Sequence, residues 1–201
     1  MTAIDPTAER NARAHQYSQE GRGDLAIPLF EEVLADRVRV LGTDHPDTLA
    51  SRNNLAGAYW SAGRVGEAIP LFEEVLADRV RVLGPDHPDT LASRNGLAGA
   101  YYSAGRLGEA IPLFEEVLAD RVRVLGDDHP DILTSRNNLA AAYESAGRLG
   151  EAIPLYEQVV ADRVRVLGAD HPLTITVREN LETLEREMNP APTSSPESSE
   201  E

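Results

Sequence analysis

One stretch of 42 residues recurs four times along the chain, and this repetition limits the possible folds more than any other feature. An offset of 42 residues aligns three sets of residues: Gly42, Gly84, Gly126 and Gly168; His45, His87, His129 and His171; Gly21, Gly63, Gly105 and Gly147. Residues 43–84 and 85–126 differ at only four positions. A fixed period of this length is typical of solenoids, in which each repeat buries its apolar side against its neighbours. We therefore expect a single elongated array.

Each repeat predicts two helices. Over residues 47–62, small and apolar residues recur at helical spacing, and Gly63 is placed to end the helix. A second helix is expected from Val65 to Leu83, with Gly84 after it. The predicted array covers residues 1–188, with units at approximately 5–42, 43–84, 85–126 and 127–168 and a capping helix at 172–188. Pro, Ser and Glu dominate residues 189–201, which we predict to be a disordered acidic tail.

Composition argues against several kinds of partner and cofactor. The net charge is −15, whereas nucleic acids and anionic membranes attract basic proteins, so we expect neither as a partner. The chain has no cysteine, which rules out disulfides and thiolate metal sites and is consistent with a reducing compartment. No apolar run approaches the about 20 residues that span a bilayer, and no signal peptide is recognisable. The expected location is the cytoplasm.

Several residues of each repeat carry a family resemblance. In the second repeat these are Leu55 and Ala56, Tyr59, Gly63 and Arg64, Glu67 and Ala68, and Phe72. This pattern resembles the tetratricopeptide repeat (TPR). The length of 42 residues, the LGxDHP linker and the NNLA sequence resemble the kinesin-light-chain-like subtype, which also occurs in bacterial signalling proteins.

The resemblance implies an all-α, right-handed superhelical solenoid of antiparallel helix pairs. The first helices of the pairs would line a concave groove and the second helices would lie outside. Such modules bind peptide segments or surfaces of other proteins and carry out no chemistry. The resemblance thus predicts a protein-protein interaction scaffold without a cofactor.

A row of asparagines is the first candidate for groove contacts. It consists of Asn11, Asn53, Asn95 and Asn137, one from each first helix. Amides can donate to and accept from the main chain of an extended ligand. In the family that the chain resembles, the first asparagine of NNLA is implicated in contacts with the peptide backbone. The alternative is that these amides bond the neighbouring first helix. We favour the groove role.

A second row is the most variable position of the repeat and holds Ser18, Trp60, Tyr102 and Glu144. Exposed aromatic residues are favoured anchors for protein partners, so Trp60 and Tyr102 are candidate binding residues. Packing between adjacent helices is an equal alternative.

A third row consists of Arg52, Arg94 and Arg136. These side chains could clamp acidic groups of a ligand through forked hydrogen bonds. The second helices also carry acidic residues, four in each of the first three repeats and three in the fourth, such as Asp78, which offer internal partners. We favour the internal pairing.

No arrangement of reactive residues predicts an enzyme or a metal site. The four repeated histidines, such as His45, lie one repeat apart, too far to share an ion whose ligands lie about 2 Å away. We expect them to stand at helix starts. Ser51 and its copies have no histidine on the same helix face, so no catalytic triad can be proposed.

Three functions remain open. The first is a scaffold that binds a peptide or partner surface in its groove. The second is a self-associating structural array, because similar repeats can stack head to tail. Arg13 and Glu185 place charge on the terminal helices and argue against this, so we expect a monomer. The third is a sensor segment of a larger bacterial signalling regulator.

Overall fold

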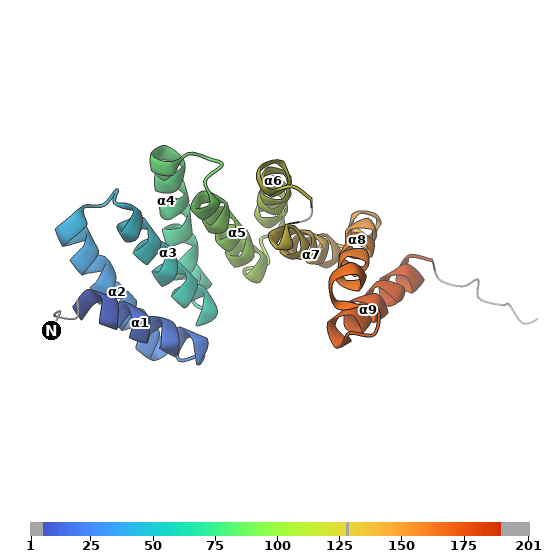
Figure 1. The fold of residues 1–201 in the computed structure, drawn as a ribbon, viewed down its shortest axis with the longest axis horizontal. Helices are drawn as coiled ribbons and strands as arrows, with labels where there is room; N and C mark the ends of the chain where they lie inside the picture. The colour runs from blue at the N-terminus through green and yellow to red at the C-terminus, as the bar shows by residue number, and fades with distance from the viewer. Residues whose placement is uncertain (1–5, 128, 190–201) are drawn as a thin grey trace, which may run out of the picture. The chain divides into compact units, whose positions relative to one another are not determined.

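The computed structural model describes residues 6–127 and 129–189, and within these ranges all regular structure is helical (Figure 1). The nine helices found there are α1 (Pro6–Gln19), α2 (Gly23–Leu41), α3 (Pro46–Ser61), α4 (Val65–Leu83), α5 (Pro88–Ser103), α6 (Leu107–Leu125), α7 (Pro130–Ser145), α8 (Leu149–Leu167) and α9 (Pro172–Met188). The predicted acidic tail, apart from Asn189, lies outside the described residues.

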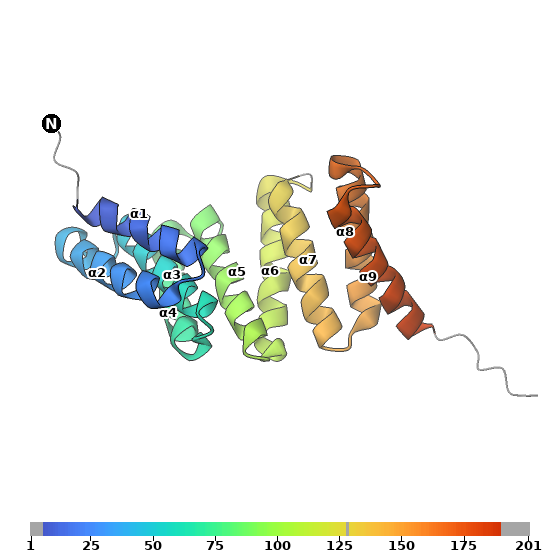
Figure 2. The same ribbon diagram turned by 90° about the horizontal axis from the view of Figure 1, so that it is seen from below.

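The chain forms two compact units, Met1–His129 with α1 to α6 and Pro130–Glu201 with α7 to α9. In the first unit each helix packs against the next one in the chain, and α3 also touches α5. In the second unit α8 packs against both α7 and α9 (Figure 2). Consecutive helices therefore form the antiparallel pairs of a TPR-like solenoid, as the repeat pattern predicted.

A histidine caps the start of three of the first helices. His45 has φ −65° and ψ 137°, and its Nδ1 accepts a hydrogen bond from the backbone N–H of Asp47 at 3.1 Å. His87 and His171 make the same bond at 3.1 and 3.3 Å. Such a bond satisfies one of the N–H groups that a helix start leaves without a partner. For these three histidines the predicted place at a helix start is confirmed.

The turn inside each helix pair is built around a tyrosine and an arginine. Gly63 has φ +74°, which glycine adopts without strain and which reverses the chain between α3 and α4. The guanidinium of Arg64 then lies 4.5 Å from the ring centroid of Tyr59 and pairs with Glu67. The same stacking recurs in three other turns, between Arg22 and Tyr17, Arg106 and Tyr101, and Arg148 and Tyr143.

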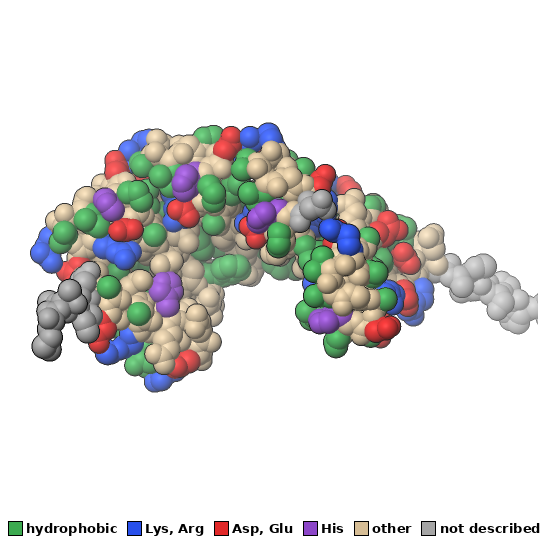
Figure 3. Space-filling view, in the orientation of Figure 1, with side chains coloured by type: hydrophobic (Ala, Val, Ile, Leu, Met, Phe, Trp, Pro, Cys, Tyr) green, Lys and Arg blue, Asp and Glu red, His purple; other side chains and the backbone are tan. Residues whose placement is uncertain are grey.

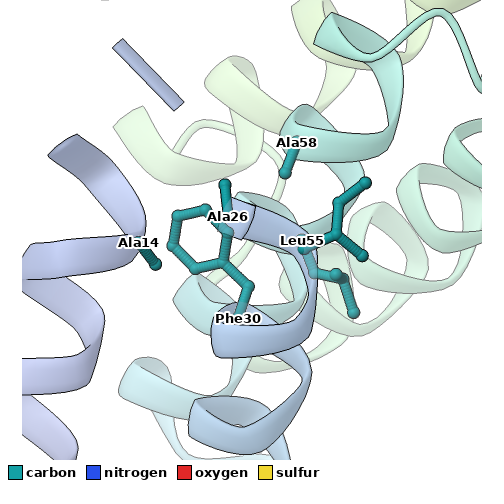
Figure 4. Packing of buried hydrophobic residues seen from close by; sticks show 6 residues of the cluster. Ala14, Ala26, Phe30, Leu55 and Ala58 are labelled. Atoms are coloured by element: carbon teal, nitrogen blue, oxygen red, sulfur yellow. The ribbon is translucent and has the colours of Figure 1, made fainter. Parts of the chain in front are cut away.

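The core lies between the helices of successive pairs. In the first unit α1, α2 and α3 contribute the buried cluster of Ala14, Ala26, Ile27, Phe30, Leu55 and Ala58 (Figure 4). The Phe30 side chain is only 1% exposed. Arg13 stands where the repeat pattern has Leu55, and it is exposed on α1 beside Glu9. The first helix thus has a charged residue at a position that is apolar in the later repeats.

Candidate functional site

Asn53 is oriented by a chain of hydrogen bonds that joins three helices of the first unit. The Ser93 hydroxyl on α5 donates to Asn53 Oδ1 on α3 at 2.8 Å. The same Ser93 oxygen accepts a hydrogen bond from Arg79 Nη1 on α4 at 2.7 Å. Asn53 therefore does bond the neighbouring first helix, which is the alternative that we considered for the asparagine row. Only its acceptor atom is used in this bond.

Arg79 is the buried end of this chain of bonds. It is 4% exposed, and its Nη1 also donates to the backbone carbonyl of Asp89 at 2.7 Å. Burial lowers the pKa of the Arg79 guanidinium from its usual value, because removal from water disfavours the charged form. Arg37 and Arg163 occupy the same repeat position and donate to the carbonyls of Asp47 and Leu173. These three arginines bond α2 to α3, α4 to α5 and α8 to α9.

The hydrogen bonding of the Asn53 amide nitrogen differs from that of the amide oxygen. Nδ2 makes no hydrogen bond within residues 6–127 and 129–189, and Asn53 lines a cavity of about 270 Å³. We call this cavity the first notch; α1, α2 and α3 form it, with side chains that include His15, Ser18, Asn53, Asn54, Gly57 and Trp60. The first notch thus brings together Asn53 of the asparagine row with Ser18 and Trp60 of the second row.

His15 forms one wall of the first notch. Its ring lies edge to face with Phe30, at 5.0 Å between centroids, and its Nε2 lies 3.3 Å from Asn54 Nδ2.

The other members of the asparagine row are all half-buried. Asn11 Oδ1 is buried with no hydrogen-bond partner among the described residues, whereas Asn95 lies on α5 and Asn137 on α7 of the second unit.

Trp60 packs between α3 and α5 and remains half-buried. Its indole lies against Gly99, where an added Cβ would come within 2.6 Å of the ring. The indole N–H donates to Ser103 Oγ at 2.9 Å, and the ring meets Phe72 edge to face at 6.4 Å between centroids. Trp60 therefore packs between helices and also lines the first notch. Tyr102, at the same repeat position of α5, is half-buried as well.

Each arginine of the third row pairs with an aspartate on the second helix of its own pair. Arg94 Nη1 lies 2.6 Å from Asp120 Oδ2, and Arg136 Nη1 lies 2.8 Å from Asp162 Oδ2. Arg52 pairs with Asp78 in the same way. The Arg94 side chain is 11% exposed. These contacts match the internal pairing that we favoured.

Neither a metal centre nor a membrane span is found in the described parts of the chain. Among residues 6–127 and 129–189, no group of three histidine or acidic side chains is placed to hold a metal ion. None of the helices described is both long enough and apolar enough to cross a bilayer. On the face drawn in Figure 3, acidic, basic and apolar side chains are interspersed.

The helix pairs recur every 42 residues, and each pair has a turn built around a tyrosine, a glycine and an arginine. Such an arrangement defines a helical repeat protein. The model of the tetratricopeptide repeat family matches residues 6–79, 53–121 and 101–163. The chain therefore belongs to the tetratricopeptide repeat family.

The chain is similar to solved structures of the kinesin-light-chain-like subtype. A putative kinesin light chain from Podosopora anserina with nearly identical TPR-like repeats is 32% identical, with a TM-score of 0.74; the match covers 94% of this chain and 100% of that one. BtubC (BKLC) from P. vanneervenii is 25% identical, with a TM-score of 0.72, over 86% of this chain and 69% of that one. No curated protein matches the chain.

A more distant structure shares the fold. A Rap protein in complex with Competence and Sporulation Factor is 13% identical, with a TM-score of 0.68, and the match covers 91% of this chain and 55% of that one. The resemblance to kinesin-light-chain-like TPR proteins, inferred from the 42-residue length, the LGxDHP linker and the NNLA sequence, is confirmed by the match to the putative kinesin light chain.

Sequence reasoning missed the serine and arginine that orient Asn53. Ser93, a copy of Ser51, was considered only as a nucleophile, and Arg79 was given no role. A signal was nevertheless present, because an arginine recurs on the otherwise apolar face of every second helix, at Arg37, Arg79, Arg121 and Arg163. A cation repeated at a core position calls for repeated oxygen partners, and Ser51 and Ser93 provide them.

Proposed function

We propose that the chain is a non-enzymatic interaction module that binds an extended segment of another protein along its first helices. The hydrogen bonding of Asn53 is the observation that supports this proposal most strongly. Its oxygen is held by Ser93, and its amide nitrogen is left as a donor on the wall of the first notch. A donor fixed in this way can bond a backbone carbonyl of a ligand without a large loss of side-chain entropy.

The aromatic row contributes contact area beside this donor. Trp60 lines the first notch, and Gly57 leaves space next to it. Tyr102 lies at the same repeat position and is proposed to contact the ligand further along. Tyrosine and tryptophan are common anchors in interfaces because they bury a large area with few rotatable bonds.

The arginine row is proposed to position the groove. Arg52, Arg94 and Arg136 hold each first helix to its partner helix through ion pairs. They thereby fix the tilt of the helix face that carries the neighbouring asparagine. Among structures of this fold, the Rap protein was solved with Competence and Sporulation Factor bound, so the fold is able to hold a partner.

The test uses Asn53→Asp, which keeps an acceptor for Ser93 and removes both Nδ2 donors. The full chain, wild type and variant, is used to select from a displayed library of random peptides of about ten residues, the length suited to four repeats. We expect peptides that bind the wild type and bind Asn53→Asp about two- to tenfold more weakly, because one hydrogen bond is lost.

Gln158→Glu is the matched control. It makes the same amide-to-carboxylate change on an exposed position of α8, so peptide affinity should stay as in the wild type. Equal weakening by both variants would show a general effect of charge and contradict the role of Asn53. Failure to select any peptide would contradict the proposed function itself.

A further inference from the structure

The second unit has a cavity at the same repeat position as the first notch. It measures about 540 Å³ and lies between the end of α7, the start of α8 and α9; we call it the last notch. Its wall includes Glu144, Asn180, Thr183, Leu184 and Glu187. These five residues stand three repeats after Ser18, Asn54, Gly57, Ala58 and Ser61, which all line the first notch. The repeat therefore places a cavity at the same position in both units, with about 270 Å³ in the first notch and about 540 Å³ in the last.

An intervening copy of this notch shows what kind of group fits. Between α3 and α5, Trp60 stands at the position of Ser18 and Glu144, and its own indole fills the space. The ring lies against Gly99, and its N–H donates to Ser103 Oγ at 2.9 Å. The notch thus accepts a flat group that carries an N–H donor. The acceptor for that donor, Ser103 Oγ, lies on the neighbouring first helix.

The last notch stands at the same repeat position but differs in charge. Glu187 stands at the repeat position of Ser103, so a carboxylate replaces the hydroxyl that accepts from the indole. Glu187 makes no hydrogen bond or ion pair within residues 6–127 and 129–189. Glu144 is exposed and accepts one bond, from the Tyr156 hydroxyl at 2.7 Å, which leaves its other oxygen for a ligand.

Two leucines contribute apolar surface to the last notch, beside the polar side chains of Asn180 and Thr183. Leu149 is half-buried at the start of α8, and Leu184 on α9 is 6% exposed. No arginine or histidine lines the last notch to neutralise its two carboxylates. A ligand group that fits must therefore be flat, rich in N–H donors, positively charged, and carried on an apolar stem.

We propose that the last notch binds an arginine side chain of the polypeptide ligand. The guanidinium donates to Glu187 and Glu144, and its methylene stem packs on Leu149 and Leu184. Arginine suits this site better than lysine because its guanidinium is planar and forks onto carboxylates. A neutral aromatic side chain would cover the two carboxylates without pairing them, which costs free energy. This inference rests on the proposed function.

The test uses the same displayed library of random peptides and the full chain, with wild type compared with Glu187→Gln. Arginine should be enriched at one position of the peptides that the wild type selects. Replacement of that arginine by citrulline, which keeps the shape and removes the charge, should weaken binding about tenfold or more, because charge-assisted hydrogen bonds are lost. With the Glu187→Gln variant, the difference in affinity between the arginine and citrulline peptides should fall below about threefold.

Glu185→Gln is the matched control, since Glu185 is exposed on the same helix but does not line the last notch. It should keep the full difference between arginine and citrulline. Peptides selected without arginine enrichment, or an arginine preference that Glu187→Gln leaves intact, would overturn the arginine site and leave the proposed function standing. If no peptide is selected at all, the proposed function fails first and the arginine site fails with it.

Discussion

At the scale of single residues, the candidate site depends on groups that no ligand would touch. Ser93 lies between the Arg79 guanidinium and the Asn53 amide, and it serves as acceptor for one and donor to the other. A buried hydroxyl in this position satisfies a cation and at the same time fixes the rotamer of a side chain on the cavity wall.

Ser93→Ala should therefore destabilise the chain. The substitution leaves Arg79 with one oxygen partner fewer and Asn53 Oδ1 without its donor, so we expect a loss of about 1–3 kcal/mol. Urea unfolding followed by circular dichroism measures it. Ser61→Ala, at an exposed position, should stay within about 0.5 kcal/mol of the wild type. Equal effects of the two substitutions would contradict the role of Ser93.

Trp60→Ala should leave the helical fold intact but weaken ligand binding. The indole fills the space beside Gly99 and also lines the first notch. Because Trp60 is only half-buried, we expect a loss of about 2 kcal/mol in stability, less than for a buried tryptophan. Calorimetry with a selected peptide measures the binding, and unchanged affinity would remove Trp60 from the site.

The rows of candidate residues could be predicted from the sequence, but their hydrogen bonds could not. Helical spacing was enough to place Asn53 and Trp60 on one helix face, and the offset of 42 residues aligned their copies into rows. The donor to Asn53 lies 40 residues away on α5, and the cation behind it comes from α4. Such a bond depends on the relative tilt of three packed helices, which periodicity does not report.

At the scale of helices, capping by histidine is a repeated device. His87 Nδ1 accepts from the N–H of Asp89, and Pro88 follows at the first helical position. His87→Ala should cost about 1 kcal/mol, the usual effect of losing a cap, in urea unfolding. His87→Asn should restore most of this loss, because asparagine is a strong cap. An asparagine variant no more stable than the alanine variant would show that capping is not the role of His87.

Asp86 links the start of α5 to α6 and makes stability sensitive to acid. Its carboxylate accepts from Arg123, including a bond at 3.0 Å from Nη1, and this hydrogen bonding lowers the pKa of Asp86. A folded-state pKa below the unfolded one means that the stabilisation is present above the unfolded pKa of about 4 and is lost as pH falls through the folded pKa.

Asp86→Asn should thus flatten the dependence of stability on pH in the acid range. Unfolding midpoints in urea from about pH 6 down to about pH 2.5 measure this. The variant and the wild type should converge at the lowest pH. A constant difference between the two at every pH would mean that ionisation of Asp86 does not contribute.

Helix positions could be predicted closely because each boundary has a local signal. The second helix of the second repeat runs from Val65 to Leu83, as expected, since the glycine after it fixes its end. The first helix begins at Pro46 and ends at Ser61, each one residue before its predicted bound. His45 is the cap, so the proline that follows already belongs to the helix.

At the scale of the whole molecule, charge on the first and last described helices argues against stacking of copies. Arg13 replaces the leucine of inner repeats, and Glu182 and Glu185 on α9 replace Ala56 and Tyr59. All three charged side chains are exposed. Burying such groups without partners is unfavourable.

We therefore expect the chain to be a monomer at high concentration. Sedimentation equilibrium measures this directly, since the mass should stay at 21.8 kDa as the concentration rises. A mass that grows with concentration would favour the self-associating array over the interaction module.

The central claim is that the first helices hold an extended polypeptide at the notches that Asn53 and its neighbours line. Titration of the isotope-labelled full chain with a selected peptide, followed by amide chemical shifts, tests it most directly. The account predicts that the largest shifts fall on His15, Asn53, Gly57 and Trp60. Shifts confined to the second helices α2, α4 and α6 would contradict it.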